Sequence, residues 1–226
     1  CYEYPRPAVT ADCIIFGFDA GTLKVLLIER GIEPFKGHWA IPGGFLRENE
    51  SADDCAKREL FEETGLENVF MEQLFSFTEP GRDPRGHVIT VAYYALVSLM
   101  EYELKAGDDA RNAAWFPIDQ LPALAFDHDR ILSFALNRLR GKIRYQPIGF
   151  ELLPERFTLP DLQALYEAIL QVKIDRRNFR RKINQTGLLI DHNESVTGVP
   201  HRGARYYSFE KAKYEQLAQR GFNFEI

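Results

Sequence analysis

The sequence predicts an α/β protein in two parts, a mixed sheet flanked by helices followed by a smaller helical part with a β-hairpin. Three observations support this. Runs of β-forming residues alternate with two helical patterns over residues 1–140. Glycines and prolines then punctuate residues 141–154. Residues 1–140 carry 14 Lys+Arg and 23 Asp+Glu, a net charge of −9, whereas residues 141–226 carry 14 and 10, a net charge of +4. Such asymmetry indicates two modules with different partners.

The first part begins with a hairpin, in which residues 8–18 and 23–29 are strands around the turn at 19–22. Further strands are expected at 39–46, 69–78, 87–99 and 113–116, with a charged, turn-rich loop at 79–86. One helix follows the strand at 39–46. A second is expected at 127–140, where apolar residues recur at helical spacing.

The composition is that of an ordinary core-forming protein, with 45% hydrophobic and 13% aromatic residues. No apolar run approaches the ~18 residues needed to span a bilayer, and no leader with an apolar core behind a basic start is visible. Cys13 lies in an apolar strand and Cys55 on the first helix, which predicts buried thiols in a reducing compartment. We therefore expect a cytoplasmic location and no membrane partner.

The first helix is delimited by local signals. Ser51 followed by Asp54 predicts a capping box at its start. Gly65 predicts its end, because a left-handed residue commonly closes a helix and glycine adopts that conformation without a Cβ penalty. Between them lies a narrow stripe of mostly small apolar residues, namely Ala52, Cys55, Ala56 and Leu60. This stripe is expected to face the core.

Three carboxylates, Glu59, Glu62 and Glu63, stand on one face near the end of this helix. Like charges at this spacing destabilise an isolated helix, and they also lie near its negative end. A divalent cation would relieve both effects, and Mg2+ (or Mn2+) is the usual ion beside phosphates. A solvated acidic helix face is the alternative reading. Arg58 and Glu50 can form a pair that braces the preceding loop against the helix.

The pattern around these glutamates is specific. It consists of Gly44, five residues, Glu50, seven residues, Arg58-Glu59-Leu60, one residue, Glu62-Glu63, one residue, and Gly65-Leu66. This resembles the signature box of the Nudix family at every defined position, and residues 39–44 resemble the family's strand and turn before the box. The resemblance covers about the first 140 residues and implies an α/β/α sandwich.

The same resemblance implies cleavage of a nucleoside diphosphate linked to another group. Glu59, Glu62 and Glu63 match the metal-binding glutamates of the box, whereas Arg58 and Glu50 match bracing and accessory positions. The metal would neutralise the diphosphate and help to form a nucleophile from water. Either Glu59 or Glu63 could help to remove the proton from that water, and the sequence leaves the choice open.

Substrate recognition lies outside the box. Gly43 and Gly44 permit close backbone approach to a phosphate. The charged candidates for contact with a diphosphate or ribose are Arg30, Lys36, Arg82, Asp83 and Arg85, with surface solubility as the alternative for the loop arginines. Trp39, Phe77 and Tyr93 are candidates for stacking on a base, but core packing is the better prediction for each of them.

The C-terminal part follows a junction at residues 141–154, so that the expected domains are 1–140 and 155–226. Thr158 caps a helix that reaches residue 170, and Asp175 caps another that ends at Gly187. Strands are expected at 188–192 and 205–209, with a polar hairpin tip between them. Helix, turn, basic helix and β-hairpin is the element order of a winged helix-turn-helix.

Basic residues gather on the second helix and the hairpin. Residues 173–205 hold eight Lys or Arg against three acids. A solvated face is the alternative, but in a winged helix these residues would converge on double-stranded DNA. The candidate DNA-binding residues are Arg176, Arg177, Asn178, Arg180, Arg181, Lys182, His201, Arg202 and Arg205. Arginines and Asn178 suit base edges, and the remaining cations suit phosphates.

The full arrangement is similar to the NrtR group of Nudix-related bacterial transcription regulators, and this resemblance covers nearly the whole chain. It implies that ADP-ribose or a related metabolite binds the Nudix domain and alters operator binding; some relatives respond to sugars. Many members have a decayed box, whereas this one is intact, so a plain ADP-ribose-type pyrophosphatase is the alternative. Because one winged helix offers limited contact area, we expect a homodimer on a roughly two-fold symmetric operator.

Overall fold

The computed structural model describes residues 4, 6–99, 110–196, 203–220 and 222. Two compact units are distinguished, the first comprising Cys1–Gly17 and Lys24–Leu136, the second comprising Phe18–Leu23 and Asn137–Ile226. Across the described residues, none of the helices combines the length and apolar character required to cross a membrane.

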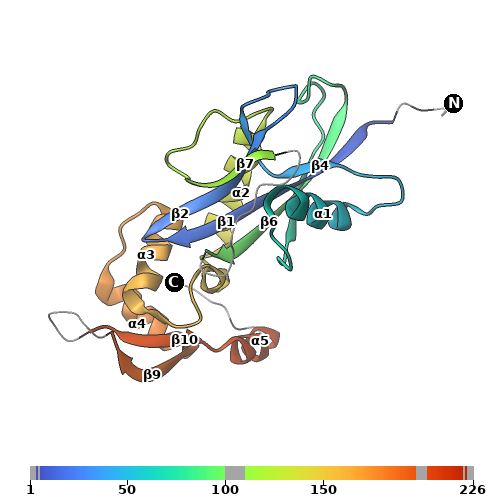
Figure 1. The fold of residues 1–226 in the computed structure, drawn as a ribbon. Helices are drawn as coiled ribbons and strands as arrows, with labels where there is room; N and C mark the ends of the chain where they lie inside the picture. The colour runs from blue at the N-terminus through green and yellow to red at the C-terminus, as the bar shows by residue number, and fades with distance from the viewer. Residues whose placement is uncertain (1–3, 5, 100–109, 197–202, 221, 223–226) are drawn as a thin grey trace. The chain divides into compact units, whose positions relative to one another are not determined.

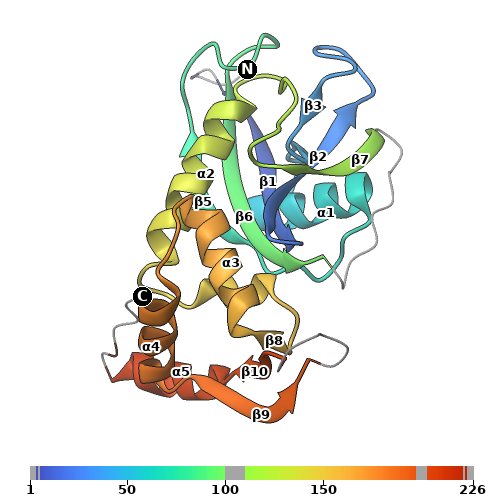
Figure 2. The ribbon, with the colours of Figure 1, turned by 90° about the vertical axis from the view of Figure 1, so that its left-hand side faces the viewer.

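The first unit is a sheet between two helices, as predicted. Its order is β3-β2-β1-β6-β5, with β4 paired to β1 and β7 paired to β2. Figures 1 and 2 show α1 and α2 on opposite faces of this mixed sheet. The elements are β1 (Ala8–Asp19), β2 (Thr22–Arg30), β3 (Trp39–Ala40), β4 (Gly43–Phe45), α1 (Ala52–Thr64), β5 (Glu72–Phe77), β6 (Val88–Ser98), β7 (Ala110–Pro117) and α2 (His128–Lys142).

Helix α1 lies close to the sheet because its buried stripe is made of small residues. Cys55, Ala56 and Leu60 are at most 1% exposed and belong to one core cluster with residues of β1 and β6. Both Cys13 and Cys55 are buried free thiols, as expected. The hydroxyl oxygen of Ser51 accepts the backbone N–H of Asp54, and Gly65 ends the helix at φ 74°. The predicted limits of the helix are confirmed.

The second unit has the winged helix order. The segment η1 (Ile148–Leu152) precedes β8 (Phe157–Thr158), α3 (Leu159–Leu170), α4 (Arg176–Thr186), β9 (Leu189–Ser195), β10 (Arg205–Phe209) and α5 (Lys211–Gln219), and the small sheet has the order β8-β10-β9. Residues 141–154, expected to be a junction, contain the end of α2 and the 3-10 turn η1. Strand β8 was not predicted because two residues carry no periodicity, and α5 was not predicted because none of its residues is buried.

Helices α3 and α4 pack through aromatic residues. Tyr166 and Phe179 are each 1% exposed, with ring centroids 5.4 Å apart. The side chain of Thr158 caps α3 in a reciprocal capping box with Asp161. Asp175 caps α4 through the backbone N–H of Asn178. These predicted caps and the inward position of Phe179 are confirmed, and they fix which face of α4 remains outside.

Candidate functional site

A cavity of about 320 Å³ in the first unit brings together most of the predicted small-molecule site. Its walls come from β1, β4, α1, the loop before β6 and the start of α2. Candidate residues that line it are Arg30, Gly43, Gly44, Arg58, Glu59, Glu62, Glu63, Arg82, Asp83 and Arg85. Lys36 is exposed and is not among the lining residues, so nothing in the cavity supports its predicted contact with substrate. Glu50 is connected to the cavity through Arg58.

Arg58 holds the box together. Its Nε and Nη2 donate to the two carboxylate oxygens of Glu50 at 2.7 and 2.9 Å, which confirms the predicted brace. Its Nη1 donates to Glu59 at 2.6 Å and to Glu62 at 3.0 Å. These hydrogen bonds lower the pKa of Glu50 to about 2 and raise the pKa of Arg58. One guanidinium thus supplies much of the countercharge that the acidic helix face needs.

Replacing Arg58 with Met is expected to destabilise the first unit by about 2 kcal/mol, because charge-assisted hydrogen bonds contribute roughly 1.5–3 kcal/mol. The Arg58 and Glu50 side chains are only 16% and 13% exposed, so water compensates little for the loss. Urea unfolding, monitored by tryptophan fluorescence, measures this loss of stability, because Trp39 and Trp115 both belong to this unit. The exposed neighbour Lys57→Met is the matched control, and equal midpoints for the two variants would contradict the bracing role.

The glycine turn before the helix binds Glu63 and closely approaches Glu59. The backbone N–H of Gly43 donates to Glu63 Oε2 at 2.8 Å. A Cβ atom on Gly44 would lie 2.3 Å from Oε1 of Glu59, and one on Gly43 would lie 2.4 Å from the carbonyl oxygen of Ala11. Both glycines therefore permit a close approach, which in this structure is made by carboxylates and backbone. Burial, with Glu59 and Asp12 nearby, raises the pKa of Glu63 to about 8.

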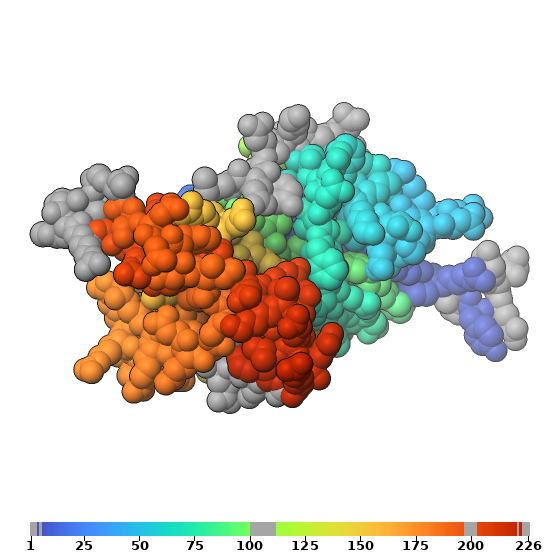
Figure 3. Space-filling model, turned by 90° about the horizontal axis from the view of Figure 1, so that it is seen from below, coloured from blue at the N-terminus to red at the C-terminus, as the bar shows by residue number. Residues whose placement is uncertain are grey.

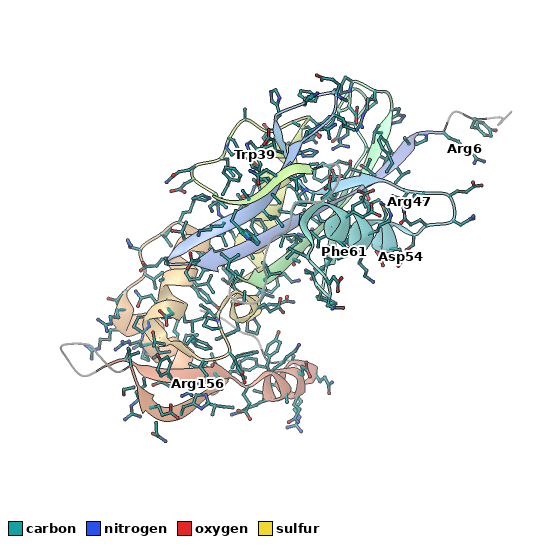
Figure 4. The ribbon with its side chains drawn as sticks, in the orientation of Figure 1. Arg6, Trp39, Arg47, Asp54, Phe61 and Arg156 are labelled. Carbon is teal, nitrogen blue, oxygen red and sulfur yellow. The ribbon has the colours of Figure 1, made fainter. Side chains whose placement is uncertain are left out.

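The glutamates have the donor chemistry of a divalent-cation site. Carboxylate oxygens are the ligands that Mg2+ prefers. A bound cation would supply a positive countercharge to the buried carboxylate of Glu63. Within the described residues, no three His, Cys, Asp or Glu side chains are gathered closely enough to hold a metal by themselves. Glu62 instead contacts Arg58 and, at 3.2 Å, Arg47 (labelled in Figure 4). In this arrangement Glu59, Glu62 and Glu63 line one cavity without forming a closed metal-binding cluster.

A buried polar cluster lies beside the box. Asp12 on β1 is 6% exposed, and burial raises its pKa to about 7. His128 accepts the backbone N–H of Ile41 at its Nδ1 atom, 2.9 Å away, while burial lowers its pKa to about 3. The hydroxyls of Thr10 and Thr90 lie 2.7 Å apart in the same wall. Sequence reasoning missed this cluster, although an aspartate inside an apolar strand was a visible signal.

The charged loop before β6 is organised by its own ion pairs. Arg82 forms two hydrogen bonds with Asp127, at 2.6 and 3.0 Å, and its side chain is 6% exposed. Asp83 is 7% exposed and accepts both the guanidinium and the backbone N–H of Arg85. All three predicted loop residues reach the cavity wall, but Arg82 serves first to fasten the loop to the residue before α2.

The aromatic residues of the cavity differ from those proposed for base stacking. Tyr93 and Phe77 are 4% and 1% exposed core residues, and Trp39 packs edge-on against Phe116 with centroids 4.5 Å apart. Their predicted alternative, core packing, agrees with these contacts. Phe45 and Phe126 line the cavity instead. Phe45 directly follows the glycine pair, which was a usable signal, whereas Phe126 precedes α2 and its position depends on tertiary structure.

The second candidate site is the outer face of α4. Arg176, Arg177, Asn178, Arg181 and Lys182 are exposed, while Arg180 is half-buried. This helix carries five Lys or Arg residues and no acid within Arg176–Thr186. Because Phe179 and Ile183 are buried on the other side, the cations are presented together. Figure 3 shows the orange-to-red surface of this unit, which includes the α4 region and α5.

The described part of the hairpin β9–β10 is less basic than predicted, since it holds one arginine, Arg205, against two acids, Asp191 and Glu194. Arg205 forms an ion pair with Asp191 at 2.7 Å. Arg156, which lies beside the hairpin in Figure 4, pairs with Glu194 at 2.6 Å and covers the ring of Tyr206. His201 and Arg202 lie outside the described residues. Arg156 was not among the predicted DNA-binding residues, because it stands well before the hairpin in sequence.

Comparison with known families identifies both parts of the chain. Residues 6–134 match the NUDIX domain, and residues 149–209 match the NrtR DNA-binding winged helix domain. The chain is 37% identical to an ADPR responsive transcriptional repressor of Acinetobacter baylyi, over 98% of this chain and 87% of that protein. It is 44% identical to an ADP-ribose pyrophosphatase of Methanocaldococcus jannaschii, over 57% of this chain and 73% of that protein.

Solved structures of Shewanella oneidensis NrtR give the same result. The complex with a 27mer DNA matches with a TM-score of 0.77 and 32% identity, covering 96% of this chain and 97% of that one. The NUDIX domain of that protein complexed with ADP ribose matches with a TM-score of 0.57 and 34% identity, covering 60% and 90%. The chain belongs to the Nudix family and joins a NUDIX domain to a winged helix domain of the NrtR type.

Proposed function

We propose that this protein is a transcriptional regulator whose NUDIX domain binds ADP-ribose or a related nucleoside diphosphate and thereby alters the affinity of its winged helix for operator DNA. The observation that carries the proposal is the presence, in one chain, of a charged small-molecule cavity and an acid-free basic helix on a winged helix. Relatives that respond to ADP-ribose or bind DNA support it.

The cavity chemistry suits a diphosphate ligand. Arg30, Arg47 and Arg85 line it and can pair with phosphate oxygens, and arginine binds such groups with two parallel hydrogen bonds. The buried hydroxyls and the carboxylate of Asp12 offer hydrogen bonds to sugar hydroxyls. A ligand with phosphates and a ribose would therefore match both the arginines and the hydroxyl and carboxylate groups of the cavity. A sugar without phosphate would offer these arginines no anionic oxygen.

We also propose that the NUDIX domain hydrolyses its ligand, because every defined position of the box is present and a related protein is an ADP-ribose pyrophosphatase. Glu59, Glu62 and Glu63 would hold Mg2+ or Mn2+, which when bound neutralises the diphosphate and acidifies water. The protein itself supplies the fixed positions of these carboxylates through Arg58 and Gly43. Glu59 and Glu63 both remain candidates for the general base. A plain pyrophosphatase is the competing function.

The proposed DNA contact places α4 in the major groove and the β9–β10 hairpin on the backbone or minor groove. A homodimer on a two-fold symmetric operator is proposed because a single module buries little area. We propose a cytoplasmic location, since the operator is reached there in a bacterium. The proposed domain limits stay at 1–140 and 155–226.

ADP-ribose is expected to weaken DNA binding by about tenfold, which corresponds to about 1.4 kcal/mol of coupling between the two sites. Linkage requires that DNA weaken ADP-ribose binding by the same factor. The measurement is fluorescence anisotropy of a labelled duplex that the protein has selected from a randomised pool. EDTA is present so that the ligand is not hydrolysed, and ribose 5-phosphate serves as the control ligand.

Calorimetry in the same buffer shows whether ADP-ribose is bound. If ADP-ribose saturates the protein and the DNA-binding curve does not change, the two sites are not coupled. The plain pyrophosphatase then replaces the regulator as the proposed function. Light scattering on the DNA complex tests the dimer, and a single copy per duplex would contradict it.

A further inference from the structure

Two phenylalanines and two arginines form an unusual group in the cavity wall. The guanidinium carbon of Arg85 lies 4.7 Å from the ring centroid of Phe45 and 5.1 Å from that of Phe126. The guanidinium carbon of Arg30 lies 4.8 Å from the same Phe126 ring. All four side chains line the cavity. The rings thus face charged, flat groups on the ligand side of the fold, unlike the core aromatics.

The Phe45 ring is partly exposed, whereas the Phe126 ring is held in place by neighbouring rings. Phe45 is 38% exposed and ends the short strand β4, next to the glycine turn that positions the box. Phe126 packs against Phe35 with centroids 4.8 Å apart and against His128 at 5.4 Å. Its backbone adopts φ 53°, which is rare for a bulky residue and requires support from its surroundings. Phe126 is therefore a fixed surface in the cavity.

The guanidinium over these rings can be replaced by another flat π group. Arginine stacks on aromatic faces because its guanidinium is planar and delocalised, and a nucleobase has both properties. The Arg85 side chain is 36% exposed, so it has a route into solvent. Its departure would break the guanidinium–Asp83 ion pair, 2.7 Å long. The turn would keep the hydrogen bond that the backbone N–H of Arg85 donates to Asp83 at 2.8 Å. Once displaced, the guanidinium can pair with a phosphate.

Arg30 adds a polar requirement to this surface. Its Nε donates to the carbonyl oxygen of Pro34 at 2.8 Å, but its Nη2 is buried and has no hydrogen-bond partner among the described residues. An unmatched buried donor is costly. A ligand atom that accepts a hydrogen bond beside Phe126, such as a ring nitrogen or a phosphate oxygen, would satisfy it.

We propose that Phe45 and Phe126 form the nucleobase contact of the cavity, and that Arg85 covers both rings in the free protein and moves to an anionic group of the ligand on binding. This assignment rests on the proposed function, because it requires a ligand that carries a base. It makes the two rings the determinants that distinguish a nucleotide-type ligand from a phosphorylated sugar.

Phe126→Leu and Phe45→Leu are each expected to weaken ADP-ribose binding by about tenfold, since stacking contributes roughly 1–3 kcal/mol per base. Calorimetry with EDTA measures binding to the full chain. Ribose 5-phosphate, which has no base, should bind all variants equally. Phe61→Leu is the matched control, because Phe61 is 48% exposed on α1 and does not line this cavity. Circular dichroism confirms folding.

The Arg85→Ala variant tests separately whether the Arg85 side chain covers the two rings and moves on binding. Adenosine, which has the base without phosphates, should bind this variant at least as well as the wild type, whereas ADP-ribose should bind it more weakly. A parallel loss for both ligands would overturn the displacement of Arg85. Wild-type ADP-ribose affinity in both phenylalanine variants would overturn the base contact.

Failure of the proposed function gives a different result. In that case the wild type binds no ADP-ribose, and the base contact is tested by measuring the binding of ADP, GDP and UDP. Binding of one of these that weakens in Phe126→Leu and Phe45→Leu sustains the base contact. Binding that is indifferent to both rings, or no binding of any nucleotide, overturns it.

Discussion

Replacing Glu62 with Gln is expected to lower Mg2+-dependent hydrolysis of ADP-ribose by at least about 100-fold. The substitution keeps the shape of the side chain but removes the charge of one of three box carboxylates. Losing a residue that only supports a metal ligand typically costs 10–100-fold, so loss of the ligand itself should cost more. Glu62 is the most accessible of the three, with a side chain 45% exposed, so the change should leave the fold intact. Release of AMP is the quantity to measure.

The matched control is Glu67→Gln, an exposed glutamate just after the helix that does not line the cavity. It should hydrolyse ADP-ribose like the wild type. If the regulator consumes its own effector, DNA binding should recover with time after a pulse of ADP-ribose in the wild type and in Glu67→Gln. The Glu62→Gln protein should stay dissociated from DNA, because it does not hydrolyse the ligand. Equal turnover in Glu62→Gln and wild type would place the chemistry outside the box.

Removing two exposed arginines of α4 together, Arg177→Ala with Arg181→Ala, is expected to weaken operator binding by at least about 30-fold, because each DNA-contacting arginine contributes roughly 1–3 kcal/mol. The two residues are four positions apart and so lie on one face of the helix. If both contact phosphates, the slope of log affinity against log salt should fall by about two. Anisotropy at several salt concentrations measures both quantities.

The control for this experiment is Arg138→Ala combined with Arg144→Ala. It removes the same net charge from the exposed part of α2 and the segment after it, away from α4 in sequence. A general electrostatic effect would weaken both double variants alike. A loss of affinity confined to α4, with an unchanged salt slope, would assign these arginines to base edges rather than phosphates. Unchanged affinity would move the DNA contact to another surface.

The sequence by itself determined the two-part architecture and the box. Helix α1 could be bounded in advance because Ser51 and Gly65 are local signals whose hydrogen bonds involve neighbours three or four residues away. The Arg58–Glu50 brace was predictable because the two residues are close in sequence, with Glu50 just before the helix and Arg58 on it. The caps of α3 and α4, and the burial of Phe179, were likewise predictable because a helix dictates which residues share a face. Local geometry fixed all of these.

Tertiary structure decided what surrounds the box. Asp12 and His128 stand 116 positions apart in sequence, yet both line one cavity wall because β1 and the start of α2 meet there. Arg82 turned out to be paired with Asp127, and Phe45 and Phe126 replaced Trp39, Phe77 and Tyr93 as cavity aromatics. Whether an arginine is free or paired, and whether a ring is in the core or in a wall, depends on partners supplied by distant strands and loops. Periodicity and spacing carry no information about those partners.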